Sequence, residues 1–276
     1  MEFWKGLLAF FEAKMGATPS YGWFHIFCVG LAAAFTVFMC IRFRDCSDKT
    51  LRRISLIIFI TLVLFDIYKQ IVFDWVNYDP ALNAFVWDYN WYSFPFQLCS
   101  TPHFVLPFII WCKDGKLRDA CIGYMTMFSL IGGAAVLAYP ESCLTYYIGA
   151  NIQTMLHHSM QVFLGIFYAV NQRKKYNNIM YYVRSSYVFL ALLSVAMVLN
   201  VVVNEIFIAN GIPDVFNMFY ISPYHTSAIP VFTELFGKIP YALYLGLYIL
   251  VLLFGGFVIY YTASKIISAK DKNEEN

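Results

Sequence analysis

Long apolar runs dominate this chain and leave it few ways to fold. They cover about 21–42, 54–74, 94–112, 118–139, 148–170, 183–209 and 239–263, and short charged loops separate them. Each run reaches the ~18 residues that a helix needs to cross a bilayer, and the runs are apolar on every face, unlike helices at the surface of a soluble protein. Charged residues make up only 13% of the chain, against roughly 25% in soluble domains. We therefore predict an all-α polytopic membrane protein with seven transmembrane helices.

The basic residues divide the loops into two sides. Of the 19 Lys and Arg residues, 15 lie in or beside the loops after the first, third and fifth runs, or in the C-terminal tail. Lys5, Lys14 and Lys238 lie on the other side, and Lys69 lies within the second run. Because basic residues collect on the cytoplasmic side of a membrane, we predict an outside N-terminus and a cytoplasmic C-terminus. An odd number of spans requires the same asymmetry.

The chain divides into a membrane domain and three flanking or connecting segments. Residues 1–20 are predicted to form an amphipathic segment on the outer interface, 21–263 the seven-helix transmembrane domain, and 264–276 a charged cytoplasmic tail. The long outer loop at 210–238 is rich in Pro and aromatic residues and poor in charge. Such a loop can fold back over an outer cavity as a lid, or it can re-enter the membrane where protein buries it.

The sequence contains no motif for a cofactor. Its seven Cys residues include no CxxC pair and no Cys/His metal spacing, so we expect no metal. The basic residues are not interleaved with stacking aromatics, which argues against nucleic acid. We expect membrane lipids as partners and no cofactor.

Polar side chains gather in the outer half of four predicted helices, while the inner halves are nearly free of them. A polar group in hydrocarbon needs a partner or a water-filled cavity, and it usually marks a functional site. Tyr224 and His225 on the outer loop are placed to complete such a site. The layer comprises Asp66, Lys69, Gln70, Gln97, Cys99, Ser100, Thr101, His103, Gln153, His157, His158, Gln161, Asn200, Asn204 and Glu205.

The histidine pair is the most unusual feature of this layer. His157 and His158 lie about 100° apart on a helix, so one narrow site cannot hold both rings. Gln153, His157 and Gln161 share one stripe of the helix, and Thr154 and His158 share another. The spacing favours His157 as the ring that faces a polar site.

Cys99 is the candidate nucleophile of the layer. We expect it one turn into a helix opened by Pro95, where the positive end of the helix dipole favours a thiolate. His103, four residues further on, lies on the same side and is a candidate local base.

Several of these residues also have purely structural interpretations. Asp66 and Lys69 have the spacing of an ion pair on one helix face. Asn200 and Asn204 have the spacing of interhelical hydrogen-bonding residues. Each histidine is equally compatible with an ordinary core role.

Four stretches of the sequence resemble the YwaF-type bacterial integral membrane family. They are FPFQLCS at 94–100, LHHSMQVFLGIFY at 156–168, Asn200, and NMFYISP to FGKIPY at 217–241. The family is distantly similar to a eukaryotic membrane family described as Cys/His-dependent glycerophospholipid acyltransferases. The resemblance implies a multi-pass protein of the bacterial plasma membrane with a lipid-modifying activity.

The same resemblance bears on individual residues. It implies that His158, rather than His157, is the functional histidine, which differs from the conclusion drawn from spacing. Where the family pattern resembles LPLHLCS, the histidine position is occupied here by Gln97.

The first functional hypothesis is a membrane-embedded enzyme that transfers or hydrolyses lipid acyl esters. Cys99 is the predicted nucleophile, and His158 or His157 accepts its proton. Gln97 and Asn200 are predicted to stabilise the oxyanion. The further candidate substrate-binding residues are Asn204, Gln161, Asp66 and His225.

Two hypotheses of other classes compete with it. A transporter or permease subunit would use Asp66, Lys69, Glu205 and the histidines as a substrate or proton site. A non-catalytic lipid-binding or sensory module would need the polar layer only to hold an intact lipid.

Overall fold

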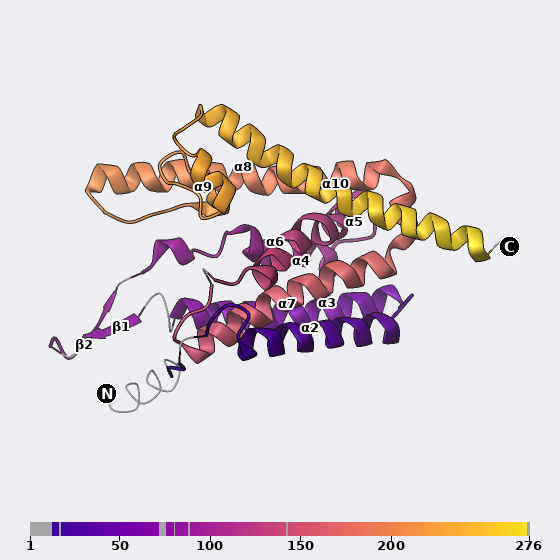
Figure 1. The fold of residues 1–276 in the computed structure, drawn as a ribbon, viewed down its shortest axis with the longest axis horizontal. Coiled ribbons are helices and arrows are strands. Elements are labelled where there is room, and N and C mark those ends of the chain that lie inside the picture. Colours follow the sequence, from indigo (N-terminus) through magenta and orange to yellow (C-terminus); the bar gives the residue numbers. More distant parts are fainter. Residues whose placement is uncertain are drawn as a thin grey trace.

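The computed structural model describes residues 13–16, 18–71, 76–79, 81–87, 89–141 and 143–274 of the protein. Long helices form a bundle whose members run roughly along one axis (Figure 1). They are α2 (Trp23–Arg42), α3 (Asp48–Lys69), α4 (Pro102–Trp111), α5 (Lys116–Tyr124), α6 (Leu130–Ala138), α7 (Ile148–Asn171), α8 (Ile179–Asn210) and α10 (Tyr241–Glu274). The π-helical turn η4 (Met125–Ser129) joins α5 and α6 into one continuous helix.

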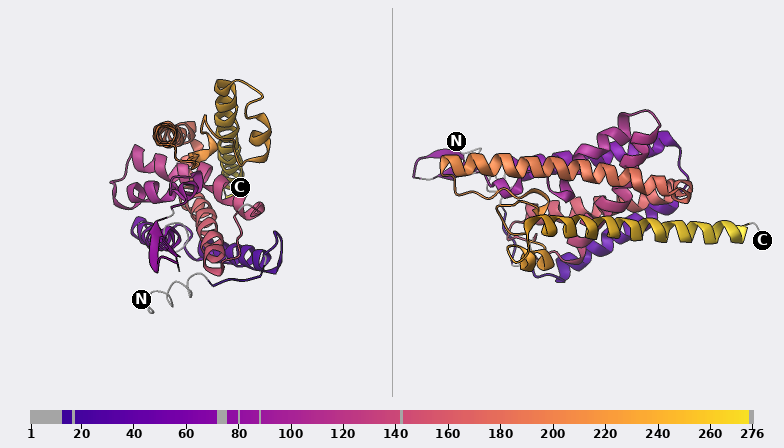
Figure 2. Two further views of the ribbon diagram at one scale, coloured as in Figure 1. Left: turned by 90° about the vertical axis from the view of Figure 1, so that its left-hand side faces the viewer. Right: turned by 90° about the horizontal axis from the view of Figure 1, so that it is seen from above.

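The bundle has two chemically different ends. We call the end where α3 and α8 finish and α7 and α10 begin the loop end, and the opposite end the basic end. The loop end lies on the left of Figure 1, and Figure 2 shows the bundle end-on and from above. It carries the short elements β1 (Val76–Asp79), β2 (Ala84–Trp87), η2 (Trp91–Ser93), η3 (Leu98–Ser100), η6 (Met218–Tyr220) and α9 (Pro230–Leu235).

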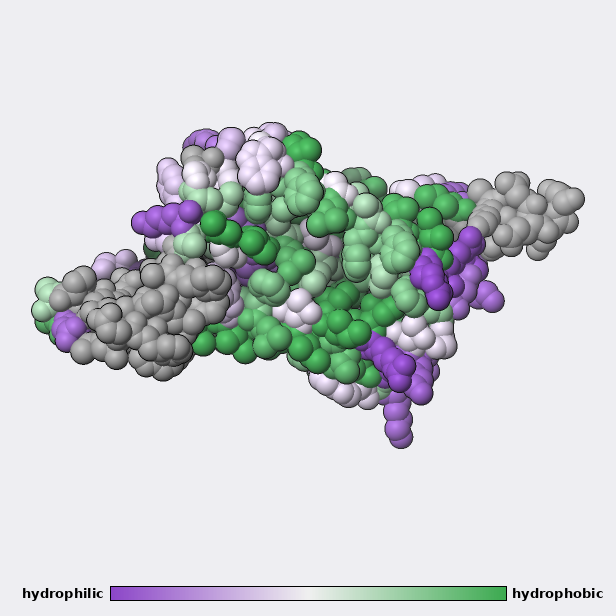
Figure 3. All heavy atoms as spheres, turned by 90° about the horizontal axis from the view of Figure 1, so that it is seen from below, coloured by the Kyte–Doolittle hydropathy of each residue, from purple (hydrophilic) through white to green (hydrophobic). Residues whose placement is uncertain are grey.

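The surface of the bundle is that of a membrane protein. Four helices in the described part of the chain are long and apolar enough to cross a bilayer: Trp23–Arg42, Lys116–Ala138, Ile179–Asn210 and Tyr241–Ile266. The outward side chains of α2 are apolar, and Trp23 and Ile41 remain 75% and 74% exposed. On the face in Figure 3 an apolar surface covers the middle of the molecule, and polar side chains lie toward its ends. The number of spans and the side of each terminus stay predictions.

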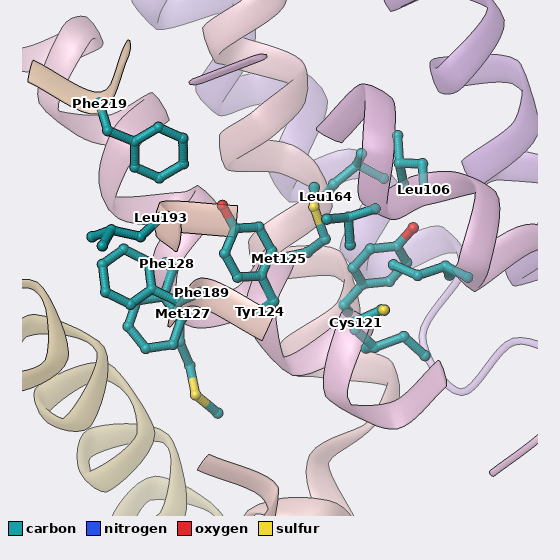
Figure 4. Close-up of a cluster of buried hydrophobic side chains, with 14 of the residues drawn as sticks. Leu106, Cys121, Tyr124, Met125, Met127, Phe128, Leu164, Phe189, Leu193 and Phe219 are labelled. Atoms are coloured by element: carbon teal, nitrogen blue, oxygen red, sulfur yellow. The ribbon is translucent and has the colours of Figure 1, made fainter. Parts of the chain in front are cut away.

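The core is aromatic and sits between α5, α7 and α8. The rings of Phe128 and Phe189 stack with centroids 4.8 Å apart and planes 4° apart. Figure 4 shows Leu193 beside this pair and Phe219, from the loop after α8, above it. The loop after α8 is therefore part of the core rather than an appendage of it.

Helix α7 lies at the centre of the bundle because glycine lets α6 approach it. A Cβ atom on Gly133 would lie 3.0 Å from the His158 carbonyl oxygen and 3.1 Å from Gln161 Cβ. These contacts leave no room for a side chain there, as at close helix crossings in membranes. Gly132, one residue earlier, has its nearest neighbour at 3.5 Å.

An ion-pair network joins the helices at the basic end. Arg118 is only 3% exposed, and its guanidinium donates to Asp48 at 2.6 Å and to Asp114. Arg52 pairs with the same two carboxylates at 2.6 and 3.0 Å. Burial raises the pKa of Asp48, but hydrogen bonds from Arg52 and Arg118 outweigh it and hold the pKa below its ordinary value. Every charge of this cluster therefore has an opposite partner.

Several predicted boundaries were wrong. The run 94–112 was predicted as one helix, but its helical part begins with the 3₁₀ turn η3 and becomes α-helical at Pro102. The helix predicted to end at 263 continues to Glu274. The predicted all-α class is confirmed, and the short antiparallel hairpin of β1 and β2 is an addition that was not predicted. Of the predicted interfacial segment 1–20, residues 1–12 and 17 lie outside the described residues.

Candidate functional site

The loop after α8 folds into the loop end of the bundle and is held there by side-chain amides. Asn200 Nδ2 donates to the Met218 carbonyl at 2.9 Å, and its Oδ1 accepts from the Met218 N–H at 2.6 Å. Gln97 Nε2 donates to the Asn217 carbonyl and its Oε1 accepts from the Phe219 N–H, both at 2.8 Å. These amides satisfy backbone groups that hydrocarbon could not. We call Gln97, Asn200 and Asn204 the loop clamp.

Asn204 extends the clamp to the far side of the loop. Its Nδ2 donates to the Phe216 carbonyl at 2.7 Å, and its Oδ1 accepts from His225 Nε2 at 2.7 Å. Burial lowers the pKa of His225. The hydrogen bond between His225 and Asn204 joins the far part of the loop to the loop clamp.

The loop clamp holds the loop backbone in a sparsely populated conformation. Phe219 and Tyr220 both have φ of +57°, a left-handed region that bulky side chains rarely occupy. Such strain persists only where the surroundings impose it. The bond from the Phe219 N–H to Gln97 is one of those constraints.

Cys99 lies beside this clamp, in the 3₁₀ turn η3 that precedes α4. The helix that follows it is opened by Pro102, not by Pro95 as predicted. Cys99 is a free, half-buried thiol. Within the described residues no hydrogen bond joins its sulfur to a histidine ring, so its pairing with His158 stays a prediction.

Three histidines surround the Cys99 turn. His157 Nε2 lies 2.8 Å from the Cys99 carbonyl oxygen. The centroid of the His103 ring lies 5.6 Å from that of the His157 ring, and the centroid of the His158 ring lies 5.3 Å from it. Both histidines of α7 are buried, at 5% and 7% exposure. The sequence predicted that one narrow site could not hold both rings. In the structure His157 contacts the Cys99 turn, and His158 lies beside His157.

Backbone carbonyls fix the tautomer of each ring. His103 Nδ1 faces the Ser100 carbonyl at 2.8 Å, and His158 Nδ1 faces the Thr154 carbonyl at 2.7 Å. Because a carbonyl oxygen only accepts, the nitrogen facing it carries the hydrogen, and the other nitrogen of a neutral ring is an acceptor. Those acceptors, His103 Nε2, His157 Nδ1 and His158 Nε2, are buried and have no partner among the described residues. We call them the bare ring nitrogens.

His25 shows what a structural histidine looks like in the same protein. It is 3% exposed, its Nε2 bonds the Leu137 carbonyl at 2.9 Å, and its Nδ1 accepts from the Tyr21 N–H at 3.1 Å. Both nitrogens are satisfied, as buried polar groups normally are. The three histidines around Cys99 depart from this norm.

The remaining predicted residues lie around this group. Gln161 is fully buried, donates to Ser129 Oγ at 3.0 Å and leaves its Oε1 without a partner. Ser129 belongs to the π-helical turn η4, a type of irregularity that is frequent at functional sites. Asp66 and Lys69 are half-buried at the end of α3, and no ion pair joins them within the described residues.

Sequence reasoning did not find two features of the site. Asn217 staples the loop to itself, because its Oδ1 accepts from the Ser222 N–H and its Nδ2 donates to the Thr226 carbonyl, both at 2.9 Å. Ser129 could not be identified as a site residue from the sequence, because a single serine in an apolar run is common.

Comparison with known proteins places the chain in a family. The family model for the TMEM164 family matches residues 18–261, which include the loop clamp, Cys99 and all three surrounding histidines. The chain belongs to the TMEM164 family. No curated protein matches the chain, and neither does any solved structure. Membership of this membrane protein family, together with the apolar helices, makes the chain an integral membrane protein. The YwaF-type resemblance stays a prediction.

Proposed function

We propose that this protein is a membrane enzyme that transfers or hydrolyses lipid acyl esters, with its site at the loop end. The observation that carries the proposal is the set of bare ring nitrogens on three neighbouring histidines, of which His157 contacts the Cys99 turn. A general base must present an unprotonated nitrogen within reach of the proton it accepts. Rings whose tautomers are fixed by backbone carbonyls are prepared for that role, and their acceptor nitrogens have no partner among the described residues.

We also propose that the loop end faces outward and that the chain crosses the bilayer seven times. Basic residues gather at the opposite end of the bundle, which supports a cytoplasmic location for that end. Helices α3, α4 and α7 run beside the four helices that meet the criteria for a span. The site then lies in the outer half of the membrane, at the depth of the ester groups of outer-leaflet lipids.

The proposed reaction is nucleophilic acyl transfer through Cys99. The Cys99 sulfur forms a bond to the ester carbon, the ester C–O bond breaks, and the thiol proton passes through a ring nitrogen to the leaving lysolipid oxygen. An acceptor hydroxyl or a water molecule then attacks the thioester, loses its proton to the same ring, and the sulfur regains a proton. His158, by resemblance, and His157, by its contact with the Cys99 turn, are the two candidate bases.

Gln97, Asn200 and Asn204 have a positioning role in this proposal. Their amides are bonded to loop backbone or to His225, so the oxyanion-binding role predicted for Gln97 and Asn200 is not part of it. Gln97 is two residues before Cys99 in the sequence and is hydrogen-bonded to the loop backbone. The position of the thiol therefore depends on the loop.

Turnover of labelled lipid by reconstituted protein tests the proposal. Protein in vesicles of phosphatidylcholine with an isotope-labelled acyl chain is expected to release labelled fatty acid or labelled acylated acceptor, detected by mass spectrometry. Cys99→Ser is expected to lower the rate at least about 100-fold, and His157→Asn or His158→Asn identifies the base by a comparable loss. His25→Asn and Cys121→Ala are matched controls and are expected to retain the rate.

The same assay decides against the proposal if no lipid ester turns over, or if the Cys99 and histidine variants keep full activity. Flux of a solute or of protons through the same vesicles, abolished by the histidine variants, would favour a transporter instead. An intact lipid that co-purifies and is lost in His158→Asn but not in Cys99→Ser would favour a non-catalytic lipid-binding module.

A further inference from the structure

A second feature of the loop end is a lysine beside an apolar groove, with no ion-pair partner in the part of the chain that the structure describes. Lys69 ends α3 and is half-buried. Among the described residues no carboxylate lies within 4.0 Å of its ammonium group, although Asp66 is only one turn away on the same helix. At the basic end Arg52, Arg118, Arg173 and Lys175 have carboxylate partners, whereas Arg184 is half-buried and has none among the described residues. Lys69 differs from Arg184 in lying beside an apolar groove and the proposed site. A half-buried cation without a partner in a membrane protein calls for an anion from outside the chain.

Lys69 lies close enough to Cys99, His157 and His158 for its charge to act on them. None of these three side chains is a carboxylate, so none is a permanent anion that neutralises Lys69. An anion bound to Lys69 would therefore lie near the reacting groups.

The groove lies on the same two helices. A cavity of about 550 Å³ is lined by Ala13, Leu64, Phe65, Tyr68, Ile148, Gly149 and Ile152. These residues are apolar except for the Tyr68 hydroxyl, and the volume lies within the roughly 300–1,000 Å³ of small-molecule sites. Tyr68, which lines the groove, immediately precedes Lys69. The close approach of Tyr68 to Gly149, where a Cβ atom would lie 1.7 Å from the hydroxyl, fixes the position of this wall.

We propose that Lys69 and this groove bind one lipid, with an acyl chain in the groove and the anionic head group on Lys69. The shared chemistry is an anion at the end of a hydrocarbon chain, which a phospholipid or a free fatty acid supplies. An uncharged lipid satisfies the groove alone and leaves Lys69 without a partner. The inference rests on the proposed function in taking this lipid as the substrate or product of the Cys99 reaction, but lipid binding itself does not require turnover.

Photolabelling measures this binding separately from catalysis. Full-length protein in vesicles of phosphatidylcholine receives trace amounts of a probe with a diazirine in its acyl chain: phosphatidylglycerol, a free fatty acid, or diacylglycerol as the neutral control. Labelled peptides are mapped by mass spectrometry. The wild type is expected to be labelled in 64–68 and 148–152, about tenfold more by one of the anionic probes than by diacylglycerol.

Charge variants test the role of Lys69. Lys69→Met is expected to lower labelling by the preferred anionic probe about tenfold, to the level of diacylglycerol, while Lys69→Arg retains it. Lys238→Met is the matched control, because Lys238 is an exposed lysine at the same end that pairs with Glu234. Labelling by diacylglycerol is expected to be the same in all variants. Ile152→Trp, which fills the groove, is expected to reduce labelling by every probe.

Two results would overturn the inference: equal labelling by anionic and neutral probes in the wild type, or unchanged labelling by the anionic probes in Lys69→Met. Labelling that depends on Lys69 without any ester turnover would retain the lipid site and remove the proposed activity. Ester turnover with labelling that does not depend on Lys69 would retain the proposed activity and remove the lipid site.

Discussion

The two ends of the bundle satisfy their polar groups with different chemistry. At the basic end, formal charges meet formal charges, and Arg52 and Arg118 share two carboxylates. At the loop end, neutral amides satisfy the backbone of a buried loop, while within the described residues three histidine ring nitrogens, Gln161 Oε1 and the Lys69 ammonium have no partner. At the basic end these charged groups are paired, and the buried atoms of the described residues that lack a partner there are the neutral hydroxyls of Tyr176 and Tyr181. Unpaired acceptors together with a cation are typical of a site that waits for a ligand.

The comparison also concerns stability, and the neutral end is the more sensitive. The Asp48 and Asp114 side chains remain 45% and 74% exposed, so water replaces a lost arginine partner. The Met218 backbone at the loop end is fully buried, and water cannot replace the Asn200 amide. We therefore expect substitutions at the loop end to lower the free energy of unfolding more than substitutions at the basic end.

The largest effect is expected for Asn200→Leu. It leaves the Met218 N–H buried without a partner and leaves the Met218 carbonyl with only the longer bond from the Ile221 N–H, at 3.3 Å. Loss of buried hydrogen bonds of this kind is expected to cost roughly 3 kcal/mol in total. Thermal unfolding in detergent would show it as a decrease in Tm of roughly 6–12 °C. Asn210→Leu is the matched control, since that asparagine is exposed on the same helix and bonds only the Ile206 carbonyl. An equal Tm for the two variants would mean that the clamp does not hold the loop.

A smaller effect is expected for Gly133→Ala, at the crossing of α6 and α7. The new methyl group meets the His158 carbonyl at 3.0 Å, and overpacking of this kind costs about 1–3 kcal/mol. Gly132→Ala has room and improves helix propensity, so it is expected to leave the Tm unchanged or to raise it slightly. The difference in Tm between the two variants is the measurement. A tolerated Gly133→Ala would show that α7 does not depend on this close contact.

The ion pairs of Asp48 at the basic end are expected to contribute weakly to stability, and this contribution is expected to be lost only at acid pH. The folded-state pKa of Asp48 is lowered, so its contribution is present above the unfolded-state pKa of about 3.9 and is lost as the pH falls through the lower folded-state value. Because the carboxylate is partly exposed, the contribution stays below about 1 kcal/mol. Stability of the wild type measured between neutral and acid pH is expected to decrease more than that of Asp48→Asn. Parallel pH curves would contradict the assigned ion pairs.

The smallest effect is expected for Lys238→Gln. Its partner Glu234 is 77% exposed, and exposed ion pairs contribute roughly 0.2–1 kcal/mol. A Tm within experimental error of the wild type is expected. A clear loss would mean that surface charge at the loop end matters more than the comparison allows.

Much of the fold could be predicted from the sequence because hydrocarbon restricts the choices so strongly. The apolar runs coincide with the long helices, and the outer polar layer contains the residues that form the loop clamp and the histidine group. Helix boundaries were less predictable: Pro95 and Pro102 are equally plausible as helix starts until the chain is folded. The β1–β2 hairpin was missed because four-residue strands are too short to give a periodic signal.

The arrangement of the site could not be predicted, because it depends on contacts between residues distant in sequence. The sequence predicts Gln97 as a site residue. In the structure its amide is instead bonded to the Asn217 carbonyl and the Phe219 N–H. His157 and His158 were expected to diverge, as their 100° separation requires. The turn containing Cys99 lies beside His157. Only the fold reveals that each ring has one bonded nitrogen and one nitrogen without a partner among the described residues.

Trapping of an acyl-enzyme tests the central claim most directly. Protein in vesicles that contain a lipid with an isotope-labelled acyl chain is quenched in acid and digested, and the peptide containing Cys99 is examined by mass spectrometry. The account predicts the mass of the acyl group on Cys99, removed by hydroxylamine and absent from Cys99→Ser. A lipid ester that turns over with no acyl group on Cys99, or with equal turnover in Cys99→Ser, would contradict it.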